Sequence, residues 1–183
     1  MSDDRRELVL DSALQTFARF GYRKTSMEAI AQAARISRPG LYFLFDSKED
    51  LFRAAVEQAL ALDLAAAAVT LEDTTRPLAG RLVEAFDHWT GRYIGAIARD
   101  ISSVIDDNPE LLGTLVVEYP ERFSQLVTAA VAGAGSATAR TPAASAADVA
   151  ATLISASIGI KQQVQTREQF VARLAVAVDL IVR

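Results

Sequence analysis

Cysteine is absent from this chain of 183 residues, and histidine occurs once, as His88. Without thiols, disulfide bonds, thiolate catalysis and cysteine-based zinc sites are excluded, and one imidazole cannot build a multi-histidine metal site. No set of nucleophile, base and acid is found: Asp87, next to His88, would point elsewhere on a helix, and no glycine-rich phosphate loop occurs. We therefore expect no enzyme, no metal and no cofactor.

Long apolar runs and a leader segment are also lacking. The first residues are charged and lead directly into an amphipathic pattern, which is unlike a signal peptide. The longest apolar stretch, Val149 to Ile160, is interrupted by serines and is shorter than the ~20 residues that span a bilayer. The sequence therefore predicts a cytoplasmic protein with no membrane partner.

The charge distribution favours a polyanionic partner, although the net charge of −4 does not. Between Arg19 and Lys48 there are six basic and two acidic residues, so this window carries +4 and the rest of the chain −8. A cationic patch on an acidic body can dock on phosphates while the body stays away from them.

The apolar spacing predicts an all-α protein of about nine helices, with strand patterns nearly absent. A first helix runs from about Asp4 to Phe20 and ends at Gly21. A capping box from Thr25 to Glu28 begins a second helix, which stops near Ala34. Ser37 caps a third helix that runs to about Phe45. These three helices form a head over residues 1–46.

The remaining residues, 47–183, form a helical body that begins with a connecting helix over 47–68. A long helix carries Leu78, Leu82, Phe86, Trp89, Tyr93 and Ile97 on one face. Further on, Ser145 and Thr166 each begin a capping box and so predict the last two helices. The short second and third helices lie in the basic window and suggest a helix-turn-helix, a moderate signal on spacing alone.

The residues themselves strengthen this interpretation. Four motifs follow one another: Gly21-Tyr22 after the first helix, Thr25-Ser26 before Ile30-Ala31, Ser37-x-x-x-Leu41-Tyr42, and Phe45-x-Ser47-Lys48-Glu49-x-Leu51. With them, the segment from Val9 to Phe52 closely resembles the DNA-binding head of the TetR family of bacterial transcriptional regulators. The resemblance implies a helix-turn-helix over about residues 26–45 and a C-terminal body for ligand binding and dimerisation.

The resemblance also implies that the positions matching Thr25, Tyr42 and Lys48 contact DNA phosphates. A hydroxyl, a phenol and an ammonium at helix starts suit this role. Lys48 lies in a first helical turn, where the helix dipole disfavours a cation, and a phosphate partner would explain it. The alternatives stay open: a packed aromatic for Tyr42, a solvated charge for Lys48.

Base reading is expected from the third helix. Arg38 can bind guanine with two hydrogen bonds, or it can only neutralise a phosphate. Pro39 and Gly40 can approach thymine methyl groups, and Phe43 lies on the same short helix. The DNA-binding set expected from the sequence is completed by Ser26, Arg35 and Ser37.

Three positions depart from the family pattern. Arg35 stands where the turn glycine is usual, and a non-glycine residue in a left-handed conformation costs roughly 1 kcal/mol. Either the turn differs, or Arg35 offsets this cost by reaching DNA. Phe43 replaces a frequent polar residue, and Leu44 the usual aromatic. Both leave the operator sequence open.

The final helix is apolar on almost all faces, and at a chain end one subunit can cover only one side of it. We expect a two-fold, four-helix dimer interface from the last two helices of each subunit. The alternative is simple burial under other helices. The expected interface residues are Leu153, Ala156, Ile160, Leu174, Val178 and Ile181.

The body should hold a pocket for a mostly apolar small-molecule inducer, as the resemblance implies. The candidate residues are Phe86, His88, Trp89, Tyr93 and Ile97, with ordinary core packing as the alternative. The expected function is that of a homodimeric repressor on double-stranded operator DNA, released by its ligand. The rival hypothesis is an all-helical small-molecule-binding protein or enzyme without operator binding.

Overall fold

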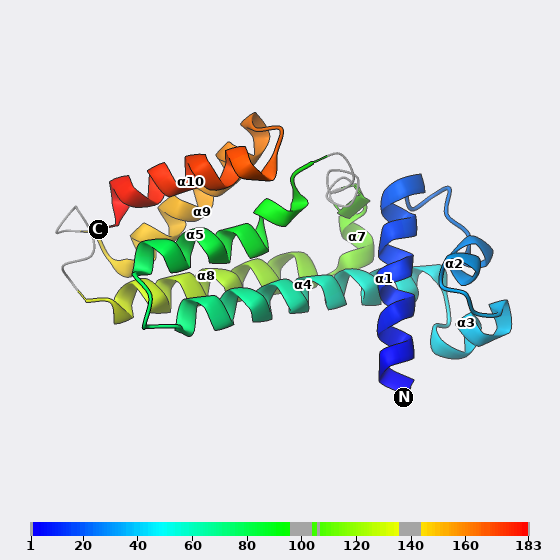
Figure 1. The fold of residues 1–183 in the computed structure, drawn as a ribbon. Coiled ribbons are helices and arrows are strands. Elements are labelled where there is room, and N and C mark those ends of the chain that lie inside the picture. Colours follow the sequence, from blue (N-terminus) through cyan, green and yellow to red (C-terminus); the bar gives the residue numbers. More distant parts are fainter. Residues whose placement is uncertain (1, 96–103, 106, 136–143, 183) are drawn as a thin grey trace. The chain divides into compact units, whose positions relative to one another are not determined.

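The computed structural model describes residues 2–95, 104–105, 107–135 and 144–182. Within these ranges all regular elements are helical, which confirms the all-α prediction. Figure 1 shows them in chain order: α1 Ser2–Phe20, α2 Met27–Ala33, α3 Arg38–Leu44, α4 Lys48–Glu72, α5 Leu78–Trp89, the 3₁₀ turn η1 Gly91–Tyr93, α7 Pro109–Leu112, α8 Leu115–Gly133, α9 Ala146–Gln163 and α10 Arg167–Ile181.

The helices form two compact units. The first unit contains residues 1–61 and the described part of 96–116, and the second contains 62–95 and 117–183. The chain crosses between them within α4, because the first half of this helix buries Leu51, Phe52 and Val56 in the first unit. The functional division predicted after residue 46 stays a prediction, and the first compact unit extends beyond it.

An aromatic cluster holds the first unit together. The ring of Phe17 in α1 meets that of Phe52 in α4 edge-on, with centroids 5.1 Å apart, and Tyr22 packs against both. The predicted apolar face of α1 is buried, including Val9, Leu10 and Ala13. Gly21 then ends α1 with a positive φ of 78°, as predicted.

In the second unit the helices pack around a core of phenylalanine side chains. α10 packs against α5 and α9 (Figure 1). The fully buried ring of Phe86 in α5 meets Phe123 in α8 edge-on, with centroids 5.1 Å apart. The predicted capping boxes are confirmed: the side chains of Ser145 and Thr166 each accept the backbone N–H three residues on.

α4 is long and apolar enough to cross a membrane, judged by length and composition alone. It is the one such helix among the described residues. The prediction that Val149–Ile160 is the longest apolar candidate was therefore wrong. Burial accounts for the composition of α4 in another way, because Leu64, Ala67 and Leu71 belong to the core of the second unit. Asp63, at the centre of the helix, has a fully buried side chain with polar partners.

Candidate functional site

A tight turn joins α2 to α3 and has the hydrogen bonds of a Schellman motif. The N–H of Ile36 donates to the carbonyl of Ala31 at 3.0 Å, and the N–H of Arg35 donates to that of Gln32 at 3.1 Å. Arg35 occupies the position that glycine usually takes, with a φ of 55°. The turn therefore keeps its left-handed form, and the arginine bears the backbone cost.

Each short helix begins with a serine cap. The Ser37 hydroxyl accepts the N–H of Gly40 at 3.1 Å, as predicted. The prediction that Thr25 caps α2 was wrong, because Ser26 is the cap and accepts the N–H of Ala29 at 3.2 Å. The buried Thr25 hydroxyl instead donates to the Gly21 carbonyl at 2.8 Å. Its hydroxyl proton is thus used within the chain.

The outer face of α3 carries large side chains with few contacts of their own. Leu41 is fully buried and anchors the helix, whereas Tyr42 is 43% exposed and Phe43 89% exposed. Arg38 and Pro39 in the first turn are exposed as well, and Gly40 is partly exposed. An aromatic ring left almost wholly in water gains nothing for folding, which marks this face as a candidate contact surface.

Arg38 is held on this face by two neighbours. Its guanidinium carbon lies 5.7 Å from the ring centroid of Tyr42, and its Nε lies 3.9 Å from the Glu28 carboxylate in α2. Both side chains of the ion pair are more than half exposed, so the pair orients Arg38 more than it stabilises the fold. The arrangement presents a guanidinium and a phenol together.

Lys48 has partners inside the chain that the sequence did not reveal. Its ammonium donates to the carbonyls of Tyr22 at 3.1 Å and Thr25 at 3.2 Å, and lies 4.4 Å from the Tyr22 ring centroid. These carbonyls and the ring offset the unfavourable dipole at the start of α4. The alternative of a simply solvated charge is wrong. An ammonium has three donors, so one is left for another acceptor.

The aromatic series expected on one long helix is divided. α5 ends at Trp89, and the next residues form the 3₁₀ turn η1. The prediction that Tyr93 lies on the same helix as Phe86 and Trp89 was therefore wrong. A Cβ at Gly91 would overlap the Asp87 carboxylate and come within 3.1 Å of the Phe170 ring, so a larger residue here would require both side chains to shift. Ile97 lies outside the described residues.

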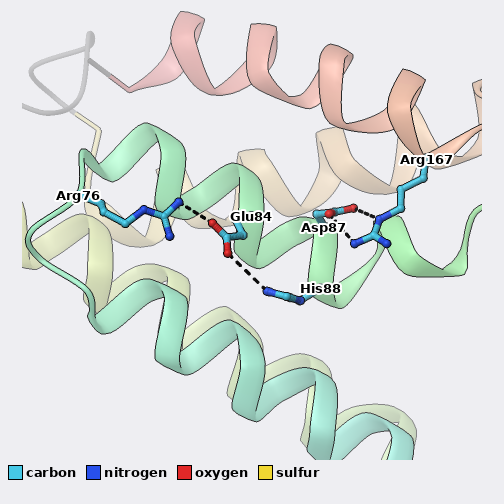
Figure 2. A network of polar contacts seen from close by, with 5 residues as sticks. All are labelled: Arg76, Glu84, Asp87, His88 and Arg167. Atoms are coloured by element: carbon cyan, nitrogen blue, oxygen red, sulfur yellow. Dashed lines mark hydrogen bonds and ion pairs between the residues drawn. The ribbon is translucent and has the colours of Figure 1, made fainter.

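The other expected ligand residues have different surroundings. Phe86 is fully buried core, and Trp89 is partly exposed, with its ring stacked 4.8 Å from that of Phe123. The His88 imidazole is partly exposed and lies 3.8 Å from the Glu84 carboxylate, one turn earlier on α5 (Figure 2). Trp89 and Tyr93, like His88, are therefore partly exposed, whereas Phe86 is not.

A buried carboxylate next to these aromatics was missed by sequence reasoning. Asp63 in α4 is ion-paired with Arg92 and accepts the hydroxyl hydrogen bond of Tyr93, both from η1. Burial raises the pKa of Asp63, although Tyr93, Arg92 and the charge of His88 act in the opposite direction. An aspartate within an otherwise apolar helical stretch was the available signal.

A separate groove of about 500 Å³ lies between α5 and α10. Small residues form part of it, and ion pairs stand at its edge: Arg76 with Glu84, and Arg167 with Asp87 through two hydrogen bonds of 2.8 and 2.7 Å (Figure 2). The groove is lined by Ala79, Gly80, Val83, Glu84, Asp87, Val171, Ala175 and Asp179. None of the predicted ligand residues is among them.

The residues expected at a dimer interface mostly belong to the subunit's own core. Leu153, Leu174 and Val178 are fully buried within the chain, and Ile160 is nearly so, which makes their placement on the surface of α9 and α10 wrong. Ala156 and Ile181 are partly exposed. The outward apolar residues are their neighbours Ile158, Val176 and Leu180, each more than half exposed.

Comparison with known families identifies the head. Residues 9–55 match the model of the bacterial regulatory proteins of the tetR family. The uncharacterized regulator YhgD of Bacillus subtilis is 40% identical over 52 residues, which are 28% of this chain and 27% of YhgD. RutR of Escherichia coli is 39% identical over 69 residues, 38% of this chain and 32% of RutR. The matches thus span about a third or less of these relatives.

Solved structures match over the whole chain at low identity. A transcriptional regulator from Saccharomonospora viridis, in complex with choline, has a TM-score of 0.79 at 21% identity, with 100% of both chains covered. Reduced NemR of E. coli has a TM-score of 0.78 at 16% identity, covering 98% of this chain and 97% of NemR. Residues 9–55 are therefore similar to the TetR-family head, and the chain shares the fold of these solved structures.

Proposed function

We propose that this protein is a homodimeric transcriptional regulator, not an enzyme, that binds operator DNA through its TetR-family head and leaves it when a small molecule binds the body. The observation that carries the proposal is the outer face of α3, where Arg38, Tyr42 and Phe43 are exposed around the buried anchor Leu41. A helix of this kind fits the major groove with its first turn toward the bases.

The contacts fall into two classes. Tyr42, Ser26 and the remaining donor of Lys48 bind phosphates and fix the register of the head. Arg38, Pro39, Gly40 and Phe43 face base edges, with Arg38 oriented for guanine by Glu28 and Tyr42. Arg35, exposed in the turn, adds a cation beside the backbone. The Thr25 hydroxyl takes no part, since it is buried and bonded to a carbonyl.

The dimer forms through the outward faces of α9 and α10. Ile158, Val176 and Leu180 are exposed there, and the core residues Leu153 and Leu174 hold the two helices in place from behind. A two-fold axis through this surface brings four helices together and covers all three apolar side chains. The two heads would then be carried about one DNA turn, or roughly 34 Å, apart.

Sequence-specific binding is tested by fluorescence anisotropy with DNA from upstream of the protein's own gene and a scrambled duplex as control. We expect a near-palindromic site, and the logarithm of the affinity should fall linearly with that of the salt concentration. Tyr42→Ala should weaken binding to all sequences and lessen the salt slope, whereas Arg38→Ala should also change the preferred sequence. Binding without salt dependence, or no preference over the scrambled duplex, contradicts the proposal.

A further inference from the structure

Asp63 occupies a core position that stability alone does not explain. It shares the buried face of α4 with Ala67 and Thr70, four and seven residues further on, and its side chain is fully buried. Removing a carboxylate from water is costly, and an ion pair within a protein often fails to repay that cost. Positions that carry such a cost are frequently sites of function.

Asp63 and Tyr93 form a small site for a cation, and the guanidinium of Arg92 occupies it. Tyr93 donates its hydroxyl to one carboxylate oxygen, and the Arg92 guanidinium is paired with the other. The same guanidinium lies 5.6 Å from the centroid of the Tyr93 ring. A carboxylate and an aromatic ring face together are the two groups that recognise organic cations.

The present occupant can be exchanged. The Arg92 side chain is half exposed, so it reaches the buried carboxylate from the solvent side and can be hydrated when it leaves. Both partners lie on η1, a turn of three residues, and not on a long helix. An incoming cation that took the place of Arg92 would have to move only a half-exposed side chain.

We propose that Asp63 and Tyr93 bind the cationic group of an amphiphilic organic cation, an amine, guanidine or quaternary ammonium, which displaces the Arg92 guanidinium. The apolar part of such a molecule would lie toward Trp89, the partly exposed residue at the end of α5, four positions before Tyr93. The inference rests on the proposed function only in taking this molecule as the effector. The chemistry of the site is independent of DNA.

The test uses the full-length protein without DNA and three probes of equal chain length: octylamine, octanol and octanoate. Binding is measured by isothermal titration calorimetry, with the emission of Trp89, the only tryptophan, as a second signal. We expect octylammonium to bind at least about tenfold more tightly than octanol, and octanoate not to bind, because a charge-assisted hydrogen bond favours the cation. Equal affinities for all three probes would overturn the proposal.

Three variants locate the site. Asp63→Asn should reduce octylammonium affinity about tenfold, to that of octanol, whereas Asp87→Asn, which loses the Arg167 pair instead, should leave it unchanged. Arg92→Ala removes the competing guanidinium and should raise octylammonium affinity about tenfold. This variant tests the proposal even if Asp63→Asn does not fold. Unchanged or weaker binding in Arg92→Ala would mean that the pair is only structural. Operator release is measured separately, so loss of DNA binding does not affect this result.

Discussion

The side chain of Lys48 fastens the start of α4 to Tyr22. Its ammonium donates to the Tyr22 carbonyl at 3.1 Å and lies 4.4 Å from the centroid of the Tyr22 ring. Tyr22 in turn packs against Phe17 and Phe52, so the contact links the end of α1, the loop before α2 and α4. A residue that the family pattern presents as a phosphate contact is thus also part of the head's internal structure.

Replacing Lys48 with Met should therefore weaken folding as well as DNA binding. The variant keeps the aliphatic chain but leaves two carbonyls without their charged donor, and we expect a loss of about 1.5–3 kcal/mol in the free energy of unfolding. Urea unfolding monitored by circular dichroism measures this. The control is Lys24→Met, an exposed lysine nearby, which should unfold at the same urea concentration as the parent. A normal midpoint for Lys48→Met, with only DNA affinity lost, would show that the ammonium serves DNA alone.

Arg35→Gly should relieve the backbone at the turn. Arg35 has a φ of 55°, which costs an L-residue about 1–2 kcal/mol, partly balanced by the entropy that glycine loses on folding. We expect the free energy of unfolding to rise by up to ~1 kcal/mol, measured by urea unfolding, with reduced operator affinity. Arg35→Ala is the matched control, since it removes the guanidinium and keeps the strained backbone. If Arg35→Ala binds operator as well as the parent, the guanidinium does not reach DNA.

Phe43 should read thymine methyl groups. Its ring is 89% exposed on α3, so Phe43→Ala should leave the unfolding midpoint unchanged. On the operator, we expect replacement of thymine by uracil at one position per half-site to weaken the parent about 5- to 100-fold and to leave Phe43→Ala unaffected. Leu41→Ala, at the buried anchor of the same helix, should instead reduce stability. Equal sensitivity of parent and variant to every uracil substitution would exclude this role.

The difference between Leu180 and Leu174 gives a test of the dimer. Leu180→Asp places a charge on the exposed face of α10, so it should give folded monomers in sedimentation velocity runs. Leu174→Asp buries the charge in the subunit core and should unfold the protein. Val69→Asp, at an exposed apolar residue of α4, is the control and should remain dimeric. A folded dimer of Leu180→Asp would place the interface on another surface.

The sequence predicted those features whose cause lies within a few residues. Gly21 ends α1, Ser37 caps α3, and the boxes at Ser145 and Thr166 begin α9 and α10, because each depends on partners three or four positions away. Among these caps, the choice between Thr25 and Ser26 failed, since both are hydroxyl residues in adjacent positions.

Features that depend on distant partners were not predictable. Asp63 and Arg92 are 29 residues apart in the chain, and nothing local joins an aspartate in α4 to a turn after α5. In α10 ten of the fifteen residues are apolar and they occur on all faces, so periodicity could not distinguish the buried Leu174 and Val178 from the exposed Val176 and Leu180. Contacts within the subunit decide which apolar face remains for a partner.

The pH dependence of stability should reveal the cost of burying Asp63. Burial raises its pKa in the folded protein above the ordinary value of 3.8. Below that value the carboxyl is protonated in both states, and as the pH rises through the window up to the folded pKa only the folded state still holds the proton. The free energy of unfolding contributed by Asp63 is therefore fully present in acid and is lost as the pH rises.

An asparagine at position 63 cannot ionise, so the free energy of unfolding of Asp63→Asn should not contain this pH-dependent loss. We expect the stability of the parent minus that of Asp63→Asn, from urea unfolding between about pH 4 and about pH 7, to decrease as the pH rises. Asp148→Asn provides the opposite case, since the Ser145 hydroxyl lowers the pKa of Asp148. The parent's advantage over Asp148→Asn should be present at neutral pH and disappear as the pH falls through the folded pKa. If the difference for Asp63→Asn instead grew with pH, Arg92, Tyr93 and His88 together would outweigh burial, and Asp63 would be an ordinary stabilising ion pair.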